Sequence, residues 1–152
     1  MNKVTVAKSA GFCFGVDRAV KMVYNELESN TKVATLGPII HNQDVVNDMN
    51  AKGARVVESV DELLPEETVV IRSHGVGREV YEKIAEKGCR MLDATCPFVA
   101  KIHKIVAEKS KEGYLVLIAG DVNHPEIQGI IGVMAFPPDS YDFRFSKVWP
   151  AV

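Results

Sequence analysis

The feature that most constrains the fold of this chain is a regular alternation of short β-branched runs with longer segments of helical period. In the helical segments, apolar residues recur every three or four positions, as in the stripe of Val16, Ala19, Val20, Val23 and Leu27. Such alternation favours βα units on a parallel sheet. The sequence therefore predicts an α/β fold with strands near residues 4–6, 33–36, 55–57, 69–71, 90–92 and 114–119, and helices from about residue 16 and near 43–52, 60–64, 78–87 and 97–111.

Composition narrows the class of protein. The 152 residues are 47% apolar and 25% charged, which is typical of a globular chain. The net charge of −2 and the dispersed basic residues predict no nucleic-acid partner, because phosphate neutralisation needs clustered Lys and Arg. The longest apolar run, 114–119, is far shorter than the ~20 residues of a transmembrane helix, and residues 1–11 lack the apolar core of a signal peptide. We therefore expect a cytoplasmic protein with no membrane partner.

Chemically useful side chains follow the ends of the predicted strands. Five of the six strand ends are followed by a Cys or a His. Because the carboxyl ends of parallel strands share one edge of a sheet, where ligands bind, we expect these side chains to lie around one site. The expected set is Cys13, His41, His74, Cys96, His124 and Glu126.

The remaining Cys and His residues are interpreted as structural. Cys89 begins a predicted strand and is expected to be a buried thiol. His103 lies in the middle of a predicted helix and is expected to be a plain surface or boundary histidine. The cysteines are odd in number and not closely spaced, which argues against a disulfide scaffold and for reduced thiols.

The expected set of side chains suits more than one chemistry. Three imidazoles and the amino ends of the following helices favour a phosphate or diphosphate, whose negative charge both stabilise. Glu126 is a candidate proton donor beside them. Cys13 and Cys96 each precede a predicted helix, where the thiolate form is favoured, so they are candidate nucleophiles or ligands of zinc or iron. Their separation of 83 residues matches no local ligand motif, so spacing does not decide between these metals.

At these loops the sequence resembles the 4-hydroxy-3-methylbut-2-enyl diphosphate reductases, which catalyse the last step of the non-mevalonate isoprenoid pathway. The resemblance is continuous over about residues 1–132. The motifs that carry it, in order and at matching spacings, are residues 10–20, 37–42, 72–76, 93–97 and 124–129.

The resemblance implies a three-lobed α/β fold around a 4Fe-4S cluster held by three cysteines, of which Cys13 and Cys96 match the first two. It implies that His41, His74 and His124 bind the diphosphate substrate and that Glu126 is the proton donor. The implied reaction removes an allylic hydroxyl reductively and gives isopentenyl and dimethylallyl diphosphate. The implied electron donor is of the ferredoxin or flavodoxin type.

This chain departs from the family in length. Family members are roughly twice as long, and the third cluster cysteine lies in the half that has no counterpart here, so we expect that the chain alone does not hold the intact cluster. We expect residues 1–96 to form the first α/β lobe and 97–132 the beginning of the second. Residues 133–152 form an atypical tail that does not match the family and holds five of the eleven aromatic residues. The alternatives are a non-catalytic phosphate-binding fragment and a zinc-dependent protein that uses the same Cys and His residues.

Overall fold

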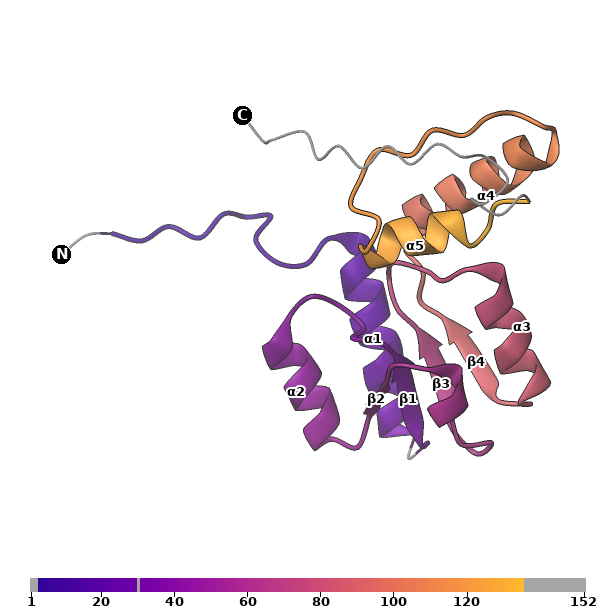
Figure 1. Cartoon of the computed structure of the whole chain (residues 1–152). Coiled ribbons are helices and arrows are strands. Elements are labelled where there is room, and N and C mark those ends of the chain that lie inside the picture. Colours follow the sequence, from indigo (N-terminus) through magenta and orange to yellow (C-terminus); the bar gives the residue numbers. More distant parts are fainter. Residues whose placement is uncertain (1–2, 30, 136–152) are drawn as a thin grey trace.

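The computed structural model describes residues 3–29 and 31–135, whose centre is a parallel sheet with helices on both faces (Figure 1). The sheet has the strand order β2-β1-β3-β4, and every neighbouring pair is parallel. Its strands are β1 (Val33–Leu36), β2 (Arg55–Val57), β3 (Thr68–Ile71) and β4 (Arg90–Asp93). The helices are α1 (Phe14–Glu28), α2 (Gln43–Ala51), the 3₁₀ helix η1 (Val60–Glu62), α3 (Arg78–Glu86), α4 (Pro97–Lys111) and α5 (Pro125–Ile131). The α/β fold and the parallel sheet are confirmed.

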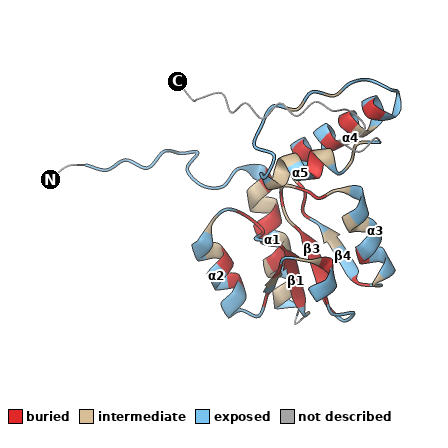
Figure 2. Cartoon of the chain, in the orientation of Figure 1, coloured by how far each residue is buried: buried red, intermediate tan, exposed pale blue. Residues whose placement is uncertain are grey.

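The two central strands are buried along their whole length because helices cover both of their faces (Figure 2). On one face, Val33 and Val70 pack with buried residues of α1 and α2. On the other face, Val69 and Ile71 pack with residues of η1 and α3, such as Ile84. Near-continuous apolar runs are what a parallel strand covered on both sides requires.

Local signals in the sequence fix where several helices begin. The side chain of Asn42 accepts a hydrogen bond from the backbone N–H of Val45 at the start of α2. Pro97 and Pro125 occupy the first turns of α4 and α5, where a missing N–H costs nothing. Cys13, Cys96 and His124 stand at the N-cap positions of α1, α4 and α5, so three candidate site residues are placed at helix starts.

The prediction of strands at residues 4–6 and 114–119 is wrong. Neither segment pairs with a neighbouring strand in the described part of the chain. Most of their apolar side chains are exposed to solvent, 86% for Val4 and 84% for Leu117, whereas Val116 and Ile118 are half-buried. A β-branched or apolar run forms a strand only beside a hydrogen-bonding partner, and the four-stranded sheet offers these two runs none.

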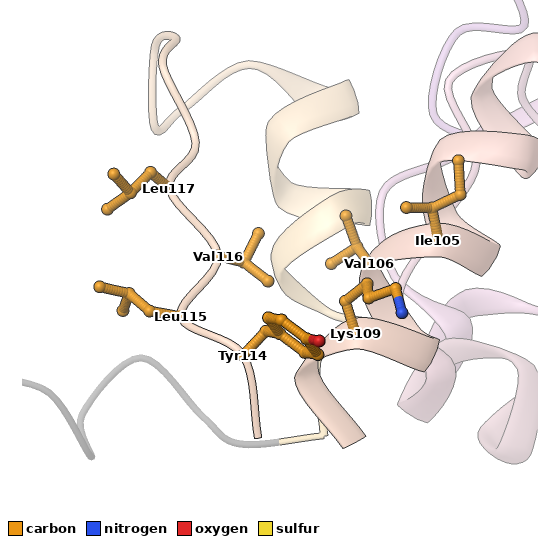
Figure 3. A pocket seen from close by; sticks show the side chains of 7 residues that line it. All are labelled: Ile105, Val106, Lys109, Tyr114, Leu115, Val116 and Leu117. Carbon is orange, nitrogen blue, oxygen red and sulfur yellow. The ribbon is translucent and has the colours of Figure 1, made fainter. Parts of the chain in front are cut away.

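The segment that follows α4 runs back along that helix and forms a shallow apolar groove with it. Figure 3 shows Val116 turned towards Val106 of α4, whereas Leu115 and Leu117 point away from the helix. The groove has a volume of about 310 Å³ and is also lined by Ile105, Lys109 and Tyr114.

Among the described residues, no helix is long and apolar enough to cross a membrane. The last part of the expected tail, residues 136–152, lies outside the described residues. The chain continues past the expected boundary at residue 96 directly into α4, which packs against α5. In Figure 1 these two helices lie together beyond the carboxyl ends of the strands.

Candidate functional site

The structure brings three of the four histidines of the chain into one cluster. The ring centroids of His41 and His74 lie 4.6 Å apart, those of His41 and His124 lie 6.0 Å apart, and those of His74 and His124 lie 5.7 Å apart. His41 and His124 are exposed and His74 is half-buried. Three imidazoles at these separations form a small, solvent-accessible patch of hydrogen-bond donors.

Each histidine of the cluster comes from a different loop. His41 follows β1, His74 follows β3, and His124 caps α5. Behind His74, the backbone turns at Gly75 with a φ of 70°, a conformation that favours glycine. A Cβ at Gly75 would also lie 3.0 Å from Cγ2 of Thr95, so the loop passes close to the segment before Cys96.

Burial, together with the charges of His41, Arg72 and His124, lowers the pKa of His74 to about 4. The ring of His74 is therefore neutral at pH 7 in the free protein. Its buried Nδ1 has no hydrogen-bond partner among the described residues. A bound anion would reverse the electrostatic effect, because a negative charge beside an imidazole favours its protonated form.

Arg72 adds a positive charge beside this cluster. Its side chain is half-buried and lies against Gly37, at the start of the loop that carries His41. Burial lowers the pKa of Arg72, and the nearby Glu58 raises it. The guanidinium remains charged at neutral pH, so it favours an anion near the histidines.

Glu126 stands in the first turn of α5, two residues after His124. Its backbone N–H donates a hydrogen bond to Nδ1 of His124 at 3.2 Å, which leaves Nε2 of that ring to face a ligand. The side chain of Glu126 is partly exposed. The structure thus places the expected proton donor on the same short helix as one histidine of the cluster.

The two cysteines expected at the site lie at the same edge of the sheet. A Cβ built on Gly15 would lie 2.6 Å from Sγ of Cys96, so the first turn of α1, which Cys13 caps, approaches Cys96 closely. The backbone N–H of Cys96 donates to the carbonyl of Ser73 at 2.9 Å, beside His74. The cysteines and the histidines are therefore parts of one region.

Arg18 of α1 fixes the segment that leads to Cys96. Its guanidinium donates hydrogen bonds to the carbonyl oxygens of Asp93 at 3.1 Å and Thr95 at 3.2 Å. The carboxylate of Asp93 accepts from the backbone N–H of Thr95 at 2.9 Å and from the hydroxyl of Tyr81 at 3.0 Å. The loop before Cys96 is thus held from both α1 and α3.

The described residues do not make up the ligand set of a three-cysteine cluster. No group of three or more His, Cys, Asp and Glu residues in that part of the chain is arranged to hold a metal ion. Cys89 is buried at the start of β4, at the opposite end of the strand from Cys96, and its thiol lies 3.5 Å from the carbonyl oxygen of Leu64. The expected burial of the Cys89 thiol is confirmed.

The expectation for His103 is wrong, because this residue is buried, with only 8% of its surface exposed. A signal for burial exists in the sequence: Val99, His103, Val106 and Ser110 recur at helical spacing and are the buried residues of α4. The ring touches Gly75 and Gly129, so it stands between the loop of His74 and the helix of Glu126.

Comparison with known proteins identifies the family of this chain. A model of the LytB protein family matches residues 4–139, which is most of the chain and ends inside the aromatic tail. The chain belongs to the LytB family. The resemblance seen in the sequence is thereby confirmed.

Relatives of this LytB-family chain carry the name 4-hydroxy-3-methylbut-2-enyl diphosphate reductase. The protein from Caldanaerobacter subterraneus subsp. tengcongensis is 46% identical over 134 residues, and that from Clostridioides difficile is 44% identical over 130 residues. The alignments cover 86% and 85% of this chain and 46% and 47% of the relatives. The chain therefore spans about half the length of the curated relatives it matches, as its length led us to expect.

Two solved structures share the fold of the LytB-family chain. One, described as (E)-4-hydroxy-3-methyl-but-2-enyl diphosphate reductase, the terminal enzyme of the non-mevalonate pathway, matches with a TM-score of 0.74 and 44% identity over 86% of this chain and 46% of its own. The other, an E-1-hydroxy-2-methyl-but-2-enyl-4-diphosphate reductase from Plasmodium falciparum, matches with a TM-score of 0.79 and 30% identity over 83% of this chain and 40% of its own. These matches identify the parallel sheet and its helices as part of the reductase fold.

Proposed function

We propose that this chain provides the diphosphate-binding part of a 4-hydroxy-3-methylbut-2-enyl diphosphate reductase. The observation that carries the proposal is the cluster of His41, His74 and His124, with the guanidinium of Arg72 beside it. Imidazole N–H groups donate charge-assisted hydrogen bonds to phosphate oxygens. The names of the relatives support a diphosphate as the ligand.

We assign the roles of the side chains from the resemblance to the reductases. The three histidines bind and orient the diphosphate group, and Glu126 supplies a proton to the hydroxyl that leaves as water. The reaction breaks the allylic carbon–oxygen bond, takes up two electrons and two protons, and gives isopentenyl or dimethylallyl diphosphate and water. The electrons come from outside the chain, through a donor of the ferredoxin or flavodoxin type in the cytoplasm.

In the proposed reductase, Cys13 and Cys96 are two ligands of a 4Fe-4S cluster, and the third cysteine comes from outside this chain. The close approach of α1 to Cys96 at Gly15 supports this pairing. In this proposal, reductase activity requires that third cysteine, which the resemblance places in the half of the family's length that has no counterpart here. The proposed anion site consists of the histidine cluster and Arg72, which all lie within this chain.

The proposed anion site is tested by titrating the chain with inorganic pyrophosphate and following the imidazole signals by NMR and the heat by calorimetry. We expect saturable binding that shifts the signals of His41, His74 and His124. The variants His41→Ala and His74→Ala should each weaken binding about 10- to 100-fold, since each removes a charge-assisted hydrogen bond of about 1.5–3 kcal/mol.

The matched control for these variants is Gln43→Ala. Gln43 is exposed, lies two positions after His41, and its side chain donates a hydrogen bond to Asn47 of its own helix. It should bind pyrophosphate as the parent chain does. Retention of full affinity in both histidine variants would contradict the proposal.

A non-catalytic phosphate-binding role is the second candidate, and the coverage of only 46% of the relatives favours it for this chain by itself. Anaerobic reconstitution with iron and sulfide separates the two. About four irons per chain with a broad visible absorption band would show a complete cluster site. A colourless chain that binds pyrophosphate would support the second candidate.

A further inference from the structure

The imidazole of His103 fills a narrow slot between two glycines of the site region. A Cβ built on Gly75 would lie 2.7 Å from Cε1 of His103, and one built on Gly129 would lie 3.1 Å from Cε1 and 3.2 Å from Nε2. Separations this short leave no room for a side chain at Gly75 and very little at Gly129. The flat ring is therefore packed directly between two stretches of backbone.

These two stretches carry the candidate site residues. Gly75 directly follows His74, and Gly129 belongs to α5, which begins after His124 and contains Glu126. A Cβ on Gly129 would lie 3.3 Å from the carbonyl oxygen of His74, so the loop and the helix also approach each other closely. His103 thus touches both of the elements whose separation sets the distance between the His74 and His124 rings.

His103 is a polar residue at a position where its ring packs against backbone in the protein interior. The residue is 92% buried, and its Nε2 has no hydrogen-bond partner among the described residues. Burial lowers the pKa of His103, while the facing carboxylates of Asp93 and Glu126 raise it. A buried polar atom without a partner destabilises a fold, so an apolar residue would serve better if packing were the only requirement.

We propose that His103 is a positioning residue of the anion site: its ring, held between Gly75 and Gly129, sets the separation of the His74 loop from α5. This inference rests on the proposed function only for its consequence, which is tighter binding of the diphosphate group. The separation of the rings themselves is a property of the chain without any ligand.

The test compares His103→Ala, which removes the spacer, with His103→Gln, which keeps a planar polar group of similar reach. Lys101→Gln, an exposed change on the same helix, is the control. We expect ring-to-ring NMR cross-peaks between His74 and His124 in the parent chain. The same cross-peaks should be present in His103→Gln and in Lys101→Gln. In His103→Ala we expect these cross-peaks to disappear and the pyrophosphate Kd to rise about tenfold, because a displacement of about 1 Å misaligns several hydrogen bonds at once.

A purely structural role gives a different result. It would lower the urea midpoint of both His103 variants while the folded protein kept its ring contacts and its pyrophosphate affinity, and that outcome would overturn the inference. If His103→Ala does not fold, Gly129→Ala takes its place, because it pushes on the ring from the other side while alanine favours the helix. Unchanged cross-peaks in Gly129→Ala would likewise overturn it.

The two proposals fail in distinguishable ways. Absence of pyrophosphate binding by the parent chain would contradict the proposed function, and the cross-peaks between the rings would still decide the role of His103.

Discussion

His74 is the residue whose environment has the clearest effect on stability. Its pKa is about 4 in the folded chain, against the ordinary value of 6.5. Between these values the unfolded chain binds more protons than the folded one, so the free energy of unfolding falls as the pH drops from about 6.5 to about 4. The half-burial of the ring limits this loss to about 1–2 kcal/mol.

We therefore expect His74→Gln to be less sensitive to acid than the parent chain. Urea unfolding at pH 7 and pH 5 measures the change in the free energy of unfolding for His74→Gln and for the parent chain. Subtracting one change from the other removes the contribution of the carboxylates that both chains share. Lys101→Gln should keep the pH dependence of the parent. An identical loss of stability in His74→Gln and the parent would show that His74 does not titrate in this range.

Gly75 and Gly88 form a matched pair of glycines for testing how tightly the site is packed. Both have a φ of 70°, but a Cβ at Gly88 would meet no atom within 4 Å, whereas one at Gly75 would meet His103 and Thr95. Gly88→Ala should cost about 1–2 kcal/mol from the left-handed backbone alone. Gly75→Ala should cost a further 1–3 kcal/mol or so from overpacking, which urea unfolding of the two variants measures directly. Equal losses would mean that the slot around His103 is looser than the structure shows.

At the residue scale, the sequence predicted the site better than its surroundings. The loop positions of His41 and His74 were enough to expect these two rings together, because the parallel sheet brings strand ends together. His124 joins them through α5 and not through a strand end. The burial of His103 depends on two glycines that lie 28 residues before it and 26 residues after it. Such a long-range fit of shapes leaves no local signal beyond helical spacing.

At the scale of elements, α1 is hydrogen-bonded to the short segment that connects the end of β4 to the start of α4. Arg18 makes this connection through two backbone carbonyls, those of Asp93 and Thr95. Because Cys96 follows directly, we expect Arg18→Met to loosen the Cys96 backbone and to raise the alkylation rate of its thiol several-fold. Mass spectrometry of iodoacetamide-treated chain resolves the modification of Cys96 from that of Cys13.

The control for this change is Lys21→Met, which removes only a surface ion pair with Asp17 on the same helix. Its alkylation rate should equal that of the parent. A parent-like rate in Arg18→Met would show that the contacts of Arg18 do not restrain Cys96.

Element prediction succeeded where the local pattern and the sheet agreed. The segments around β1 to β4 were expected correctly because each contains a pair of adjacent apolar residues or more and each finds a parallel neighbour. The segments at residues 4–6 and 114–119 have the same local pattern but no neighbour in the described sheet. Cys13 and His124 nevertheless reach the expected edge, since α1 and α5 bring them there without a preceding strand.

At the scale of the molecule, α4 presents an apolar stripe to solvent. Phe98, Ile102 and Ile105 recur at helical spacing and are 72%, 41% and 48% exposed. Leu115 and Leu117 extend this surface next to the groove. Exposed apolar surface of this extent promotes association, so we expect the chain to self-associate as its concentration rises.

Sedimentation velocity over a range of concentrations measures this association. Ile105→Lys should weaken it several-fold, because a charge in the stripe must be desolvated on contact. Val122→Lys places the same charge on an exposed valine of the loop before α5 and serves as the control. If both variants associate like the parent, the stripe on α4 is not the contact surface.

The short length of α5 affects how long the site persists in solution. A helix of seven residues is too short to be stable by itself, so α5 stays folded through its packing on α4 and through the hydrogen bond from the N–H of Arg78 to the carbonyl of Gly132 at 3.0 Å. Local undocking of α5 would separate His124 and Glu126 from His74 while the sheet stayed intact. Amide hydrogen exchange in α5 therefore reports the fraction of time for which the site is assembled, independently of the global stability of the fold.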